Sequence, residues 1–553
     1  MKRFLENKGA IASLALLYTG SLFAAEERPN IIFILTDDQP FQLLGANGHP
    51  VVKTPNLDKL AKEGVRFTNA HVSTAISTPS RTCMLTGRFE RSHGVNFNSE
   101  TSLSPEAWSE CYPNVLRASG YYTGYVGKNH TPIGPDAYKT GLMEESYDYW
   151  YGGHEHLSFY PKTRHQIFKG AKSDTQIEVL VEGMMDFLNP NERSLAGALH
   201  FMGSRPKEQP FFLNVCFNLP HDAGTSTMKQ LESDSELYKS AYRDVEMPLP
   251  ENYIAKKDIK TPKLPAHVLR VEDRQTGYDW VDTPEALRER LIRQCQTVTG
   301  IDNLVGKLLA ELKKQKIDKN TIIIFSSDHG VFSGQYGLGG KALCYELCTK
   351  VPLIIFDPRT KVAKADKVND ELVLSIDYAQ TILEYAGTKA PASYQGKSLV
   401  PMMEGKEEKV RDYLFSENLW ATPFGNPPCE AVQTKEWKYI RYYKNPMLSA
   451  RTIETLRKQM NMPPNTVYRE NNSFLQYRTY VEQRLNGEEP IYEELYNLKN
   501  DPWEAKNLIG EAQYKELVAK MRVECDKQLR YARGEGNPRV CITSPKHDKQ
   551  TLK

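Results

Sequence analysis

The chain has 553 residues, of which 40% are hydrophobic and 25% are charged, and its formal net charge is +2. A chain of this length can bury a sizeable core and is expected to divide into two domains. The nearly neutral charge balance gives no argument for a nucleic-acid-binding protein, since such proteins carry a basic surface.

The first 25 residues have the layout of a secretory signal peptide. Three basic residues among the first eight precede an apolar run from residue 10 to 23, and the pair Ala24-Ala25 stands before polar residues. The apolar run is too short and too interrupted to span a bilayer comfortably, and no later stretch has the character of a transmembrane segment. The pattern therefore predicts an exported protein, periplasmic or secreted, without an integral membrane segment.

Four apolar runs with the character of buried strands each end in polar residues. Continuous apolar runs of this kind, separated by helical stretches, predict a mostly parallel sheet covered by helices on both faces. In such a sheet the ligand crevice lies beyond the carboxyl ends of the strands. We therefore expect the polar side chains to meet in one crevice. The runs and their polar ends are 30–35 with Asp37-Asp38, 123–126 with Lys128-Asn129-His130, 211–217 with His221, and 321–325 with Asp328-His329.

Apolar periodicity predicts helices and further strands between and after these runs. The helices are expected at 54–64, at 284–314 with a break at Gly300, at 378–385 and at 513–531, and the strands at 351–356, 437–442 and 493–498. A polar run at 404–409 interrupts the apolar pattern. We therefore expect a catalytic domain over residues 26–405 and a smaller C-terminal domain over residues 406–553.

Nine cysteines are scattered along the chain without the dense spacing of a disulfide framework. They are predicted to be mostly free, buried thiols, and Cys83 is interpreted as a packing residue.

The segment Ser77-Thr78-Pro79-Ser80-Arg81, closed by Thr86-Gly87, combines a small oxygen nucleophile with features of an anion site. Pro79 suits the first turn of a helix, because its φ is preset and its missing amide proton would have had no helical partner. Ser77 would then lie just ahead of the helix N-terminus, where free N–H groups and the dipole favour an anion. Arg81, about one turn later, could direct its planar donors at a sulfate or a phosphate. The alternative interpretation is an ordinary Ser-Pro helix start with a surface arginine.

Asp37-Asp38 and Asp328-His329 bring three carboxylates and an imidazole from two strand ends. Adjacent like charges are costly unless a cation offsets them, and hard oxygen donors suit Ca²⁺ or Mg²⁺. The alternative for either pair alone is a set of helix-capping aspartates and a core histidine.

The Ser77 segment resembles the signature of the formylglycine-dependent sulfatases, a family of the alkaline-phosphatase-like superfamily. The resemblance implies an α/β fold with a large mixed, mostly parallel sheet sandwiched by helices, and a smaller C-terminal α+β domain with antiparallel strands. It also implies that Ser77 is oxidised to 3-oxoalanine (formylglycine), whose hydrate is the nucleophile. A serine at this position implies a partner, a radical-based sulfatase-maturating enzyme of the bacterial kind.

The same resemblance assigns the remaining site. It implies one divalent ion, usually calcium with magnesium as the alternative, and it implies sulfate held by Arg81, Lys128 and Lys341. His130 would help to release the sulfate and His221 would protonate the leaving oxygen. Asn129 and His329 depart from the family, which usually carries an aromatic residue and Asn at these positions. The implied catalytic residues are Ser77, Arg81, Lys128, His130, His221 and Lys341, and the implied metal ligands are Asp37, Asp38, Ser77, Asp328 and His329.

The leading hypothesis is an exported sulfatase that hydrolyses a sulfate ester of a sulfated carbohydrate or polysaccharide. The first alternative is a phosphatase or phosphonate monoester hydrolase of the same superfamily, because a tetrahedral anion site does not identify sulfur. The second alternative is a non-catalytic sugar-binding relative. Aromatic stretches at 149–156 and at Trp420 with Phe424 are expected in loops, where they would suit sugar rings or pack the two domains together.

Overall fold

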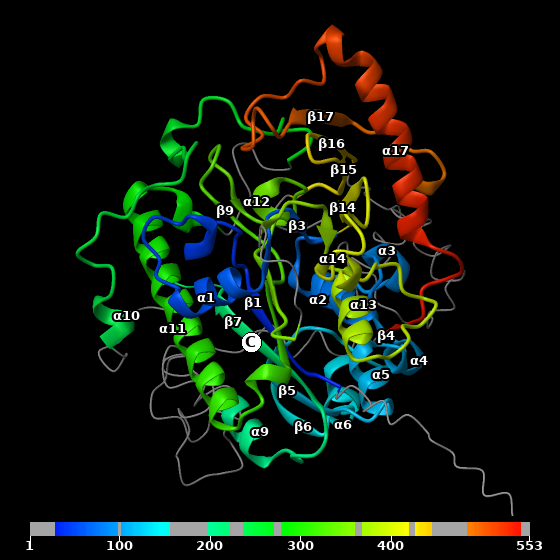
Figure 1. Cartoon of the computed structure of the whole chain (residues 1–553). Helices are drawn as coiled ribbons and strands as arrows, with labels where there is room; N and C mark the ends of the chain where they lie inside the picture. The colour runs from blue at the N-terminus through cyan, green and yellow to red at the C-terminus, as the bar shows by residue number, and fades with distance from the viewer. Residues whose placement is uncertain are drawn as a thin grey trace, which may run out of the picture.

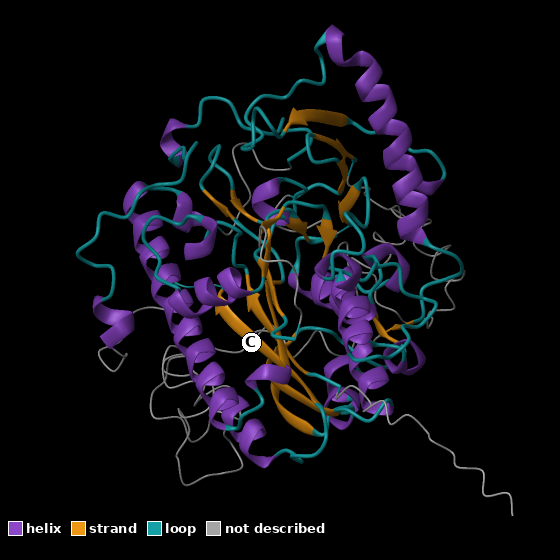
Figure 2. Ribbon diagram, in the orientation of Figure 1, coloured by secondary structure: helices purple, strands orange, loops and turns teal. Residues whose placement is uncertain are grey.

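The computed structural model describes residues 28–97, 101–154, 197–221, 223, 236–269, 278–359, 368–419, 426–444 and 484–542. The predicted signal peptide, the end of the 149–156 stretch, and Trp420 with Phe424 lie outside these residues. Figures 1 and 2 show a large sheet flanked by helices and a smaller sheet beside a long C-terminal helix. Among the described helices, none combines the length and the apolar composition that a bilayer-spanning segment needs.

The large sheet has eight strands in the order β12-β2-β11-β8-β1-β7-β5-β6. Its five strands from β8 to β6 are parallel, whereas β11 runs antiparallel to both β8 and β2. The sheet is therefore mixed and mostly parallel, as predicted. The strands are β1 (Asn30–Asp37), β2 (Val65–Phe67), β5 (Tyr122–Asn129), β6 (Tyr149–His154), β7 (Phe211–Pro220), β8 (Thr321–Ser327), β11 (Leu353–Phe356) and β12 (Val368–Asn369).

Helices cover both faces of the large sheet (Figure 1). Ile32 and Ile34 of β1 lie in one buried apolar cluster with side chains of α1 (Pro55–Glu63), α9 (Ala198–Ser204) and α11 (Pro284–Lys314). Ile31 and Phe33 lie in the opposite cluster, with side chains of α2 (Ser77–Thr86), α5 (Tyr112–Ala118) and α13 (Asp377–Tyr385). Burial on both faces explains why these strands are continuous apolar runs rather than alternating ones.

Two local predictions were wrong. The helix α11 continues through Gly300, which is buried within it. A glycine costs a helix only about 1 kcal/mol, and the apolar packing on both sides of it outweighs that cost. The aromatic stretch from Tyr149 to His154 is not a loop but strand β6, at the edge of the sheet. Its Trp150 stacks on Tyr125 of β5, with ring centroids 5.0 Å apart, so part of this aromatic surface is used inside the fold.

The smaller sheet is an antiparallel meander of four strands packed against the C-terminal helix α17 (Lys515–Arg533). A last strand, β18 (Val540–Ile542), returns to pair with β4 (Thr101–Leu103) in the first half of the chain and was not predicted. The boundary between residues 405 and 406 stays a prediction. The strands of the meander are β14 (Leu414–Asn418), β15 (Cys429–Gln433), β16 (Trp437–Tyr442) and β17 (Tyr492–Asn497). All nine cysteines are free, and eight of them are buried, in agreement with the prediction.

A buried ion-pair network joins the smaller sheet to helix α3 (Glu90–His93). Arg91 donates from Nε to Glu417 at 2.9 Å and from a terminal nitrogen to Glu430 at 2.8 Å, and all three side chains are fully buried. Arg441 and Arg484 also donate to Glu430, at 2.8 and 2.9 Å. Burial alone would raise the pKa of Glu430, but the arginines outweigh it and hold the pKa at about 2.

Replacing Arg91 by methionine is expected to lower the free energy of unfolding by about 3–5 kcal/mol, because two buried carboxylates lose a cationic partner. Urea unfolding measures this change. Arg117→Met is the matched control, since Arg117 pairs with Asp148 at 2.9 Å but is 42% exposed. The control should change the stability by less than about 1 kcal/mol. Equal losses for the two variants would contradict the assignment of Arg91 as a buried link.

Candidate active site

Helix α2 begins at Ser77 itself rather than one residue after it, and it places Pro79 in the first turn, as expected. It ends at Gly87, which has φ +62°. A Cβ at position 87 would lie 2.6 Å from the ring of Tyr394, and the carbonyl of Gly87 accepts from the amides of Gln395 and Gly396. The Thr86-Gly87 pair therefore marks a left-handed turn at the end of the helix, and the nearby Tyr394 ring leaves no room for a side chain at position 87.

The ends of the adjacent parallel strands β1 and β8 bring the predicted metal ligands together. One potential ligand atom from each of Asp37, Asp38, Asp328 and His329 lies within 4.8 Å of the others, and all four residues are buried. Asp38 has the left-handed φ of 56°, and its N–H donates to Oδ1 of Asp328 at 3.0 Å. Three carboxylates and one imidazole at this spacing fit a divalent cation, with oxygen as the dominant donor.

The hydrogen bonds of His329 fix which of its nitrogens faces this cluster. Nδ1 lies 3.0 Å from the carbonyl oxygen of Gly330, which can only accept, so Nδ1 carries the proton. In the neutral ring, Nε2 is then a lone-pair donor directed at the cluster, 3.1 Å from Asp38 Oδ1. Ser77 Oγ lies 3.2 Å from this Nε2 and 3.3 Å from Asp37 Oδ1. The predicted nucleophile therefore touches the predicted metal site.

Three buried or nearly buried cations oppose the three carboxylates. Arg81 donates from Nε to Asp328 at 2.9 Å, Lys128 donates to Asp37, and Lys341 donates to both oxygens of Asp38 at 2.8 and 3.0 Å. Burial raises the pKa of Asp38, but Lys341 outweighs it and holds the pKa at about 2. Burial likewise raises the pKa of Asp37, and Lys128, with His221 and Arg81, brings it well below its usual range.

The charges of this set indicate what the site can bind. Three carboxylates and three cations sum to zero, so a divalent cation alone would leave two uncompensated positive charges in a region of low dielectric. A negatively charged tetrahedral group bound beside the metal reduces that excess. The composition therefore favours a metal and a sulfate-like or phosphate-like group bound together.

The two predicted histidines are placed at the same strand ends. His221 follows β7, and its Nε2 lies 3.6 Å from Oδ2 of Asp38. His130 follows β5 and contacts the ring of Phe97 edge-on, with centroids 5.7 Å apart. Phe97 packs against Ile76 and Ala342, the neighbours of Ser77 and Lys341. The structure thus gathers Ser77, Arg81, Lys128, His221 and Lys341 through direct contacts and His130 through Phe97.

Two supporting side chains were missed by sequence reasoning. Asn129 donates to the carbonyl of Thr131 at 3.2 Å and lies 3.0 Å from Nδ1 of His154, which in turn lies 2.7 Å from Glu144. This chain of hydrogen bonds holds the backbone that carries His130. Asn426 donates to the carbonyl oxygens of Lys341 and Ala342. The contacts of Asn129 with His154 and of Asn426 with Lys341 have no sequence signal, since they join residues 25 and 85 positions apart.

Comparisons with known proteins find family models and relatives that this chain resembles. A family model described as "Sulfatase" matches residues 29–388, and one described as "N-sulphoglucosamine sulphohydrolase, C-terminal" matches residues 334–452. An N-acetylglucosamine-6-O-sulfatase of Bacteroides thetaiotaomicron is 26% identical, over 91% of this chain and 87% of its own.

Two solved structures share the fold. One, of a protein in complex with its substrate D-glucosamine-2-N,6-O-disulfate, aligns with a TM-score of 0.65 and 22% identity, covering 92% of this chain and 98% of the other. A phosphonate monoester hydrolase of Agrobacterium radiobacter also aligns with a TM-score of 0.65, at 21% identity, covering 91% and 96% of the two chains. At these identities the structural matches establish the α/β fold.

Proposed function

Because the chain belongs to the sulfatase family and is a sulfuric ester hydrolase, we propose that it removes a sulfate ester from a sulfated carbohydrate or polysaccharide. The observation that carries this proposal is the contact of Ser77 Oγ with Asp37 and His329, beside three cations able to hold a tetrahedral anion. The saccharide class is supported by the names of the relatives, an N-acetylglucosamine-6-O-sulfatase and a protein bound to a glucosamine disulfate.

The catalytic roles follow from the contacts of each side chain. We assign the divalent cation, calcium with magnesium as the alternative, to Asp37, Asp38, Asp328 and His329. Together with formylglycine formed from Ser77, this cation supplies an acidified hydroxyl as the nucleophile. Arg81, Lys128 and Lys341 neutralise the non-bridging oxygens of the sulfate group. Each of these three side chains donates to a carboxylate of the site, and this contact holds its N–H donors in place before the substrate binds.

We assign the two proton transfers of the reaction to His221 and His130. Nε2 of His221 lies 3.6 Å from Oδ2 of Asp38, within the site, and we assign His221 as the acid that protonates the leaving oxygen. His130 lies two residues after Lys128, and the hydrogen bonds of Asn129 hold its backbone. We assign His130 as the base for the step that releases sulfate. Both residues are nearly buried, which keeps bulk water from competing for these protons.

The main rival is a phosphatase or phosphonate monoester hydrolase. The structural match to such an enzyme has the same TM-score as the match to the protein bound to a glucosamine disulfate, so fold alone does not discriminate. Among the residues that the structure describes, one group of three or more His, Cys, Asp or Glu side chains could hold a metal. A two-metal phosphatase needs a second set, so the ligands of the described residues argue against that class of phosphatase.

The discriminating experiment compares turnover of 4-nitrophenyl sulfate and 4-nitrophenyl phosphate by protein in which Ser77 has been converted. We expect kcat/KM for the sulfate to exceed that for the phosphate by at least about 100-fold, or roughly 2.7 kcal/mol. Faster turnover of the phosphate would overturn the sulfatase proposal. Turnover of neither ester, with a sulfated saccharide still bound, would favour the non-catalytic sugar-binding alternative.

We also propose that the protein is exported, to the periplasm or the medium, and that a sulfatase-maturating enzyme acts on Ser77 before or during export. Export rests on the signal-like pattern of residues 1–25, which lie outside the described structure. Recovery of unprocessed full-length protein from the cytoplasm of its native host would contradict it.

A further inference from the structure

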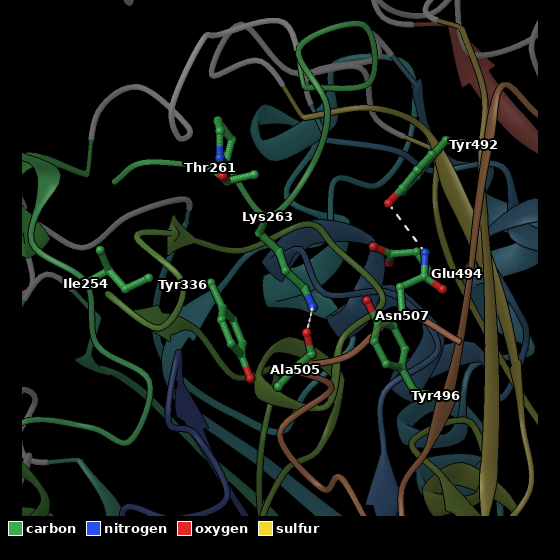
Figure 3. Close-up of a pocket in the computed structure, with 10 residues that line it drawn as sticks. Ile254, Thr261, Lys263, Tyr336, Tyr492, Glu494, Tyr496, Ala505 and Asn507 are labelled. Atoms are coloured by element: carbon green, nitrogen blue, oxygen red, sulfur yellow. Dashed lines mark hydrogen bonds between the residues drawn. The ribbon is translucent and has the colours of Figure 1, made fainter. Parts of the chain in front are cut away.

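A cavity of about 260 Å³ lies apart from the metal site and shares no residue with it. It is bounded by residues 254–263, by the turn between β9 (Phe332–Ser333) and β10 (Gly339–Gly340), and by β17 with the turn that follows it. Figure 3 shows Lys263 between Tyr336 and the β17 side chains Glu494 and Tyr496. Pockets for drug-sized ligands are about 300–1,000 Å³, so this cavity matches one ring-sized molecule.

The ammonium group of Lys263 lies among aromatic rings at the centre of this cavity. Its Nζ is 4.6 Å from the ring centroid of Tyr336 and 4.8 Å from that of Tyr496. It donates to the carbonyl oxygens of Glu504 and of Ala505, the latter at 3.4 Å. An ammonium has three donors, so these two acceptors leave one N–H of Lys263 for a ligand.

Tyr492 offers the cavity a second donor and an aromatic face. Its hydroxyl oxygen accepts from Nδ2 of Asn507 at 3.4 Å, so the phenolic proton remains available to a ligand. The ring is partly exposed and contacts His267 edge-on, with centroids 6.3 Å apart. A partly exposed ring beside directed donors is the usual lining of a site for a small ring with hydroxyl groups.

The charges around the cavity favour an uncharged ligand. Lys263 is the one cation among the described residues that line it, and the buried Glu494 lies close enough to affect its pKa. Burial lowers the pKa of Lys263, while Glu494 and Glu504 oppose that effect. A second sulfate or carboxylate would meet a single lysine together with the nearby carboxyl groups of Glu494 and Glu504, in contrast to the three cations around Ser77.

The cavity is connected to the catalytic centre by a short hairpin. Tyr336 occupies the turn of that hairpin, and Lys341 follows its second strand directly. Five residues span at most about 18 Å, so the backbone of Tyr336 at the cavity lies within about 18 Å of the backbone of Lys341, a distance that a short oligosaccharide covers.

We propose that this cavity is a subsite for one uncharged sugar ring, two or more units away from the sulfated unit of the same glycan. Lys263 and Tyr492 donate to its hydroxyl or acetamido oxygens, and the Tyr492 ring packs on one of its faces. This assignment rests on the proposed function, because it takes the glycan to be the substrate. The alternative is that Lys263 merely fastens the segment 254–263 to the smaller sheet.

Direct binding tests the subsite independently of catalysis. The probe is the neutral β1,4-linked disaccharide of N-acetylglucosamine, and binding is followed by saturation-transfer NMR. We expect the wild type to bind it, Tyr492→Ala to weaken binding about tenfold, and Tyr492→Phe to weaken it less. Ser77→Ala should bind as the wild type does. Absence of binding to the wild type, or unchanged binding to Tyr492→Ala, overturns the proposal.

Kinetics then separate a subsite from a structural contact. With a sulfated oligosaccharide that carries neutral units, Tyr492→Ala should raise KM about tenfold and leave kcat within twofold, while turnover of 4-nitrophenyl sulfate stays unchanged. Tyr514→Ala is the matched control, a half-buried tyrosine that contacts Trp437 and does not line the cavity. Equal losses on both substrates would assign Tyr492 a purely structural role and overturn the subsite. A wild type that turns over neither the sulfated oligosaccharide nor nitrophenyl sulfate would instead refute the proposed function and leave the binding result standing.

Discussion

Replacing Ser77 by alanine is expected to lower kcat/KM by roughly 10⁴- to 10⁶-fold, the range seen when an enzyme loses its nucleophile. Ser77 Oγ is the atom that contacts both Asp37 and His329, and it stands at the first position of α2 with Arg81 one turn further on. Alanine removes that oxygen and leaves the helix start, including Pro79, unchanged. The variant should therefore fold as the wild type does, with unchanged circular dichroism.

Ser73→Ala is the matched control for this experiment. Ser73 is as buried as Ser77, but its hydroxyl donates to Sγ of Cys83 at 3.3 Å and not to a residue of the site. Its loss should leave kcat/KM within a few fold. A comparable collapse in Ser73→Ala would mean that the activity depends on the packing around α2 rather than on the oxygen at position 77.

The maturation of Ser77 gives the same prediction a chemical readout. An unconverted serine, once sulfated, has no second hydroxyl from which to expel the sulfate. Protein made in a host without a radical-based maturation enzyme should therefore fold normally and remain nearly inactive. The peptide containing residue 77 should be lighter by two hydrogen atoms when converted, and mass spectrometry measures this. Full multiple turnover by protein with unmodified Ser77 would exclude the formylglycine mechanism.

The candidate site could be predicted from the sequence because the functional side chains of a parallel sheet lie at the carboxyl ends of its strands. Asp37 ends β1, Asp328 follows β8, and Thr36 pairs with Ser327 in the register of these two adjacent strands. The apolar runs before them predicted the strands, and the rule for parallel sheets predicted that their ends would meet. Local composition and the topology rule were therefore enough to predict that these carboxylates lie in one crevice.

The parts that were missed depend on contacts between residues far apart in the chain. Strand β18 pairs with β4 across more than 400 residues, and its three residues have too short a pattern to be recognised. Asn426 supports Lys341 from the smaller sheet, although an isolated asparagine reads as a turn residue. At Gly300 the propensity of a single residue favoured a break, but burial within α11 decided the outcome. In each case tertiary packing overrides a weak local preference.

Replacing Asp328 by asparagine is expected to abolish metal binding and to lower kcat/KM by about 1,000-fold or more, since a bound metal contributes several kcal/mol to such reactions. Asp328 serves two groups at once. Its Oδ1 accepts from the amide of Asp38, and its Oδ2 accepts from Nε of Arg81 at 2.9 Å. Asparagine keeps the shape but removes the charge, so the cation loses a ligand and Arg81 loses its ionic partner. Metal content per chain, measured by plasma emission spectrometry, should fall from one to nearly zero.

Asp302→Asn is the control that separates loss of the metal from loss of a buried aspartate. Asp302 is fully buried in α11 and accepts from the amide of Leu57 at 2.8 Å, outside the acidic cluster. That variant should unfold more easily and keep its metal and its kcat.

Treating the wild type with EDTA should reproduce the Asp328→Asn phenotype and lower Tm, because an ion that binds the native state stabilises it by mass action. Adding back Ca²⁺ or Mg²⁺ separately then identifies the native ion by which one restores Tm and turnover. Full activity of the metal-free wild type would contradict the role assigned to this cluster, because catalysis would then not depend on a bound ion.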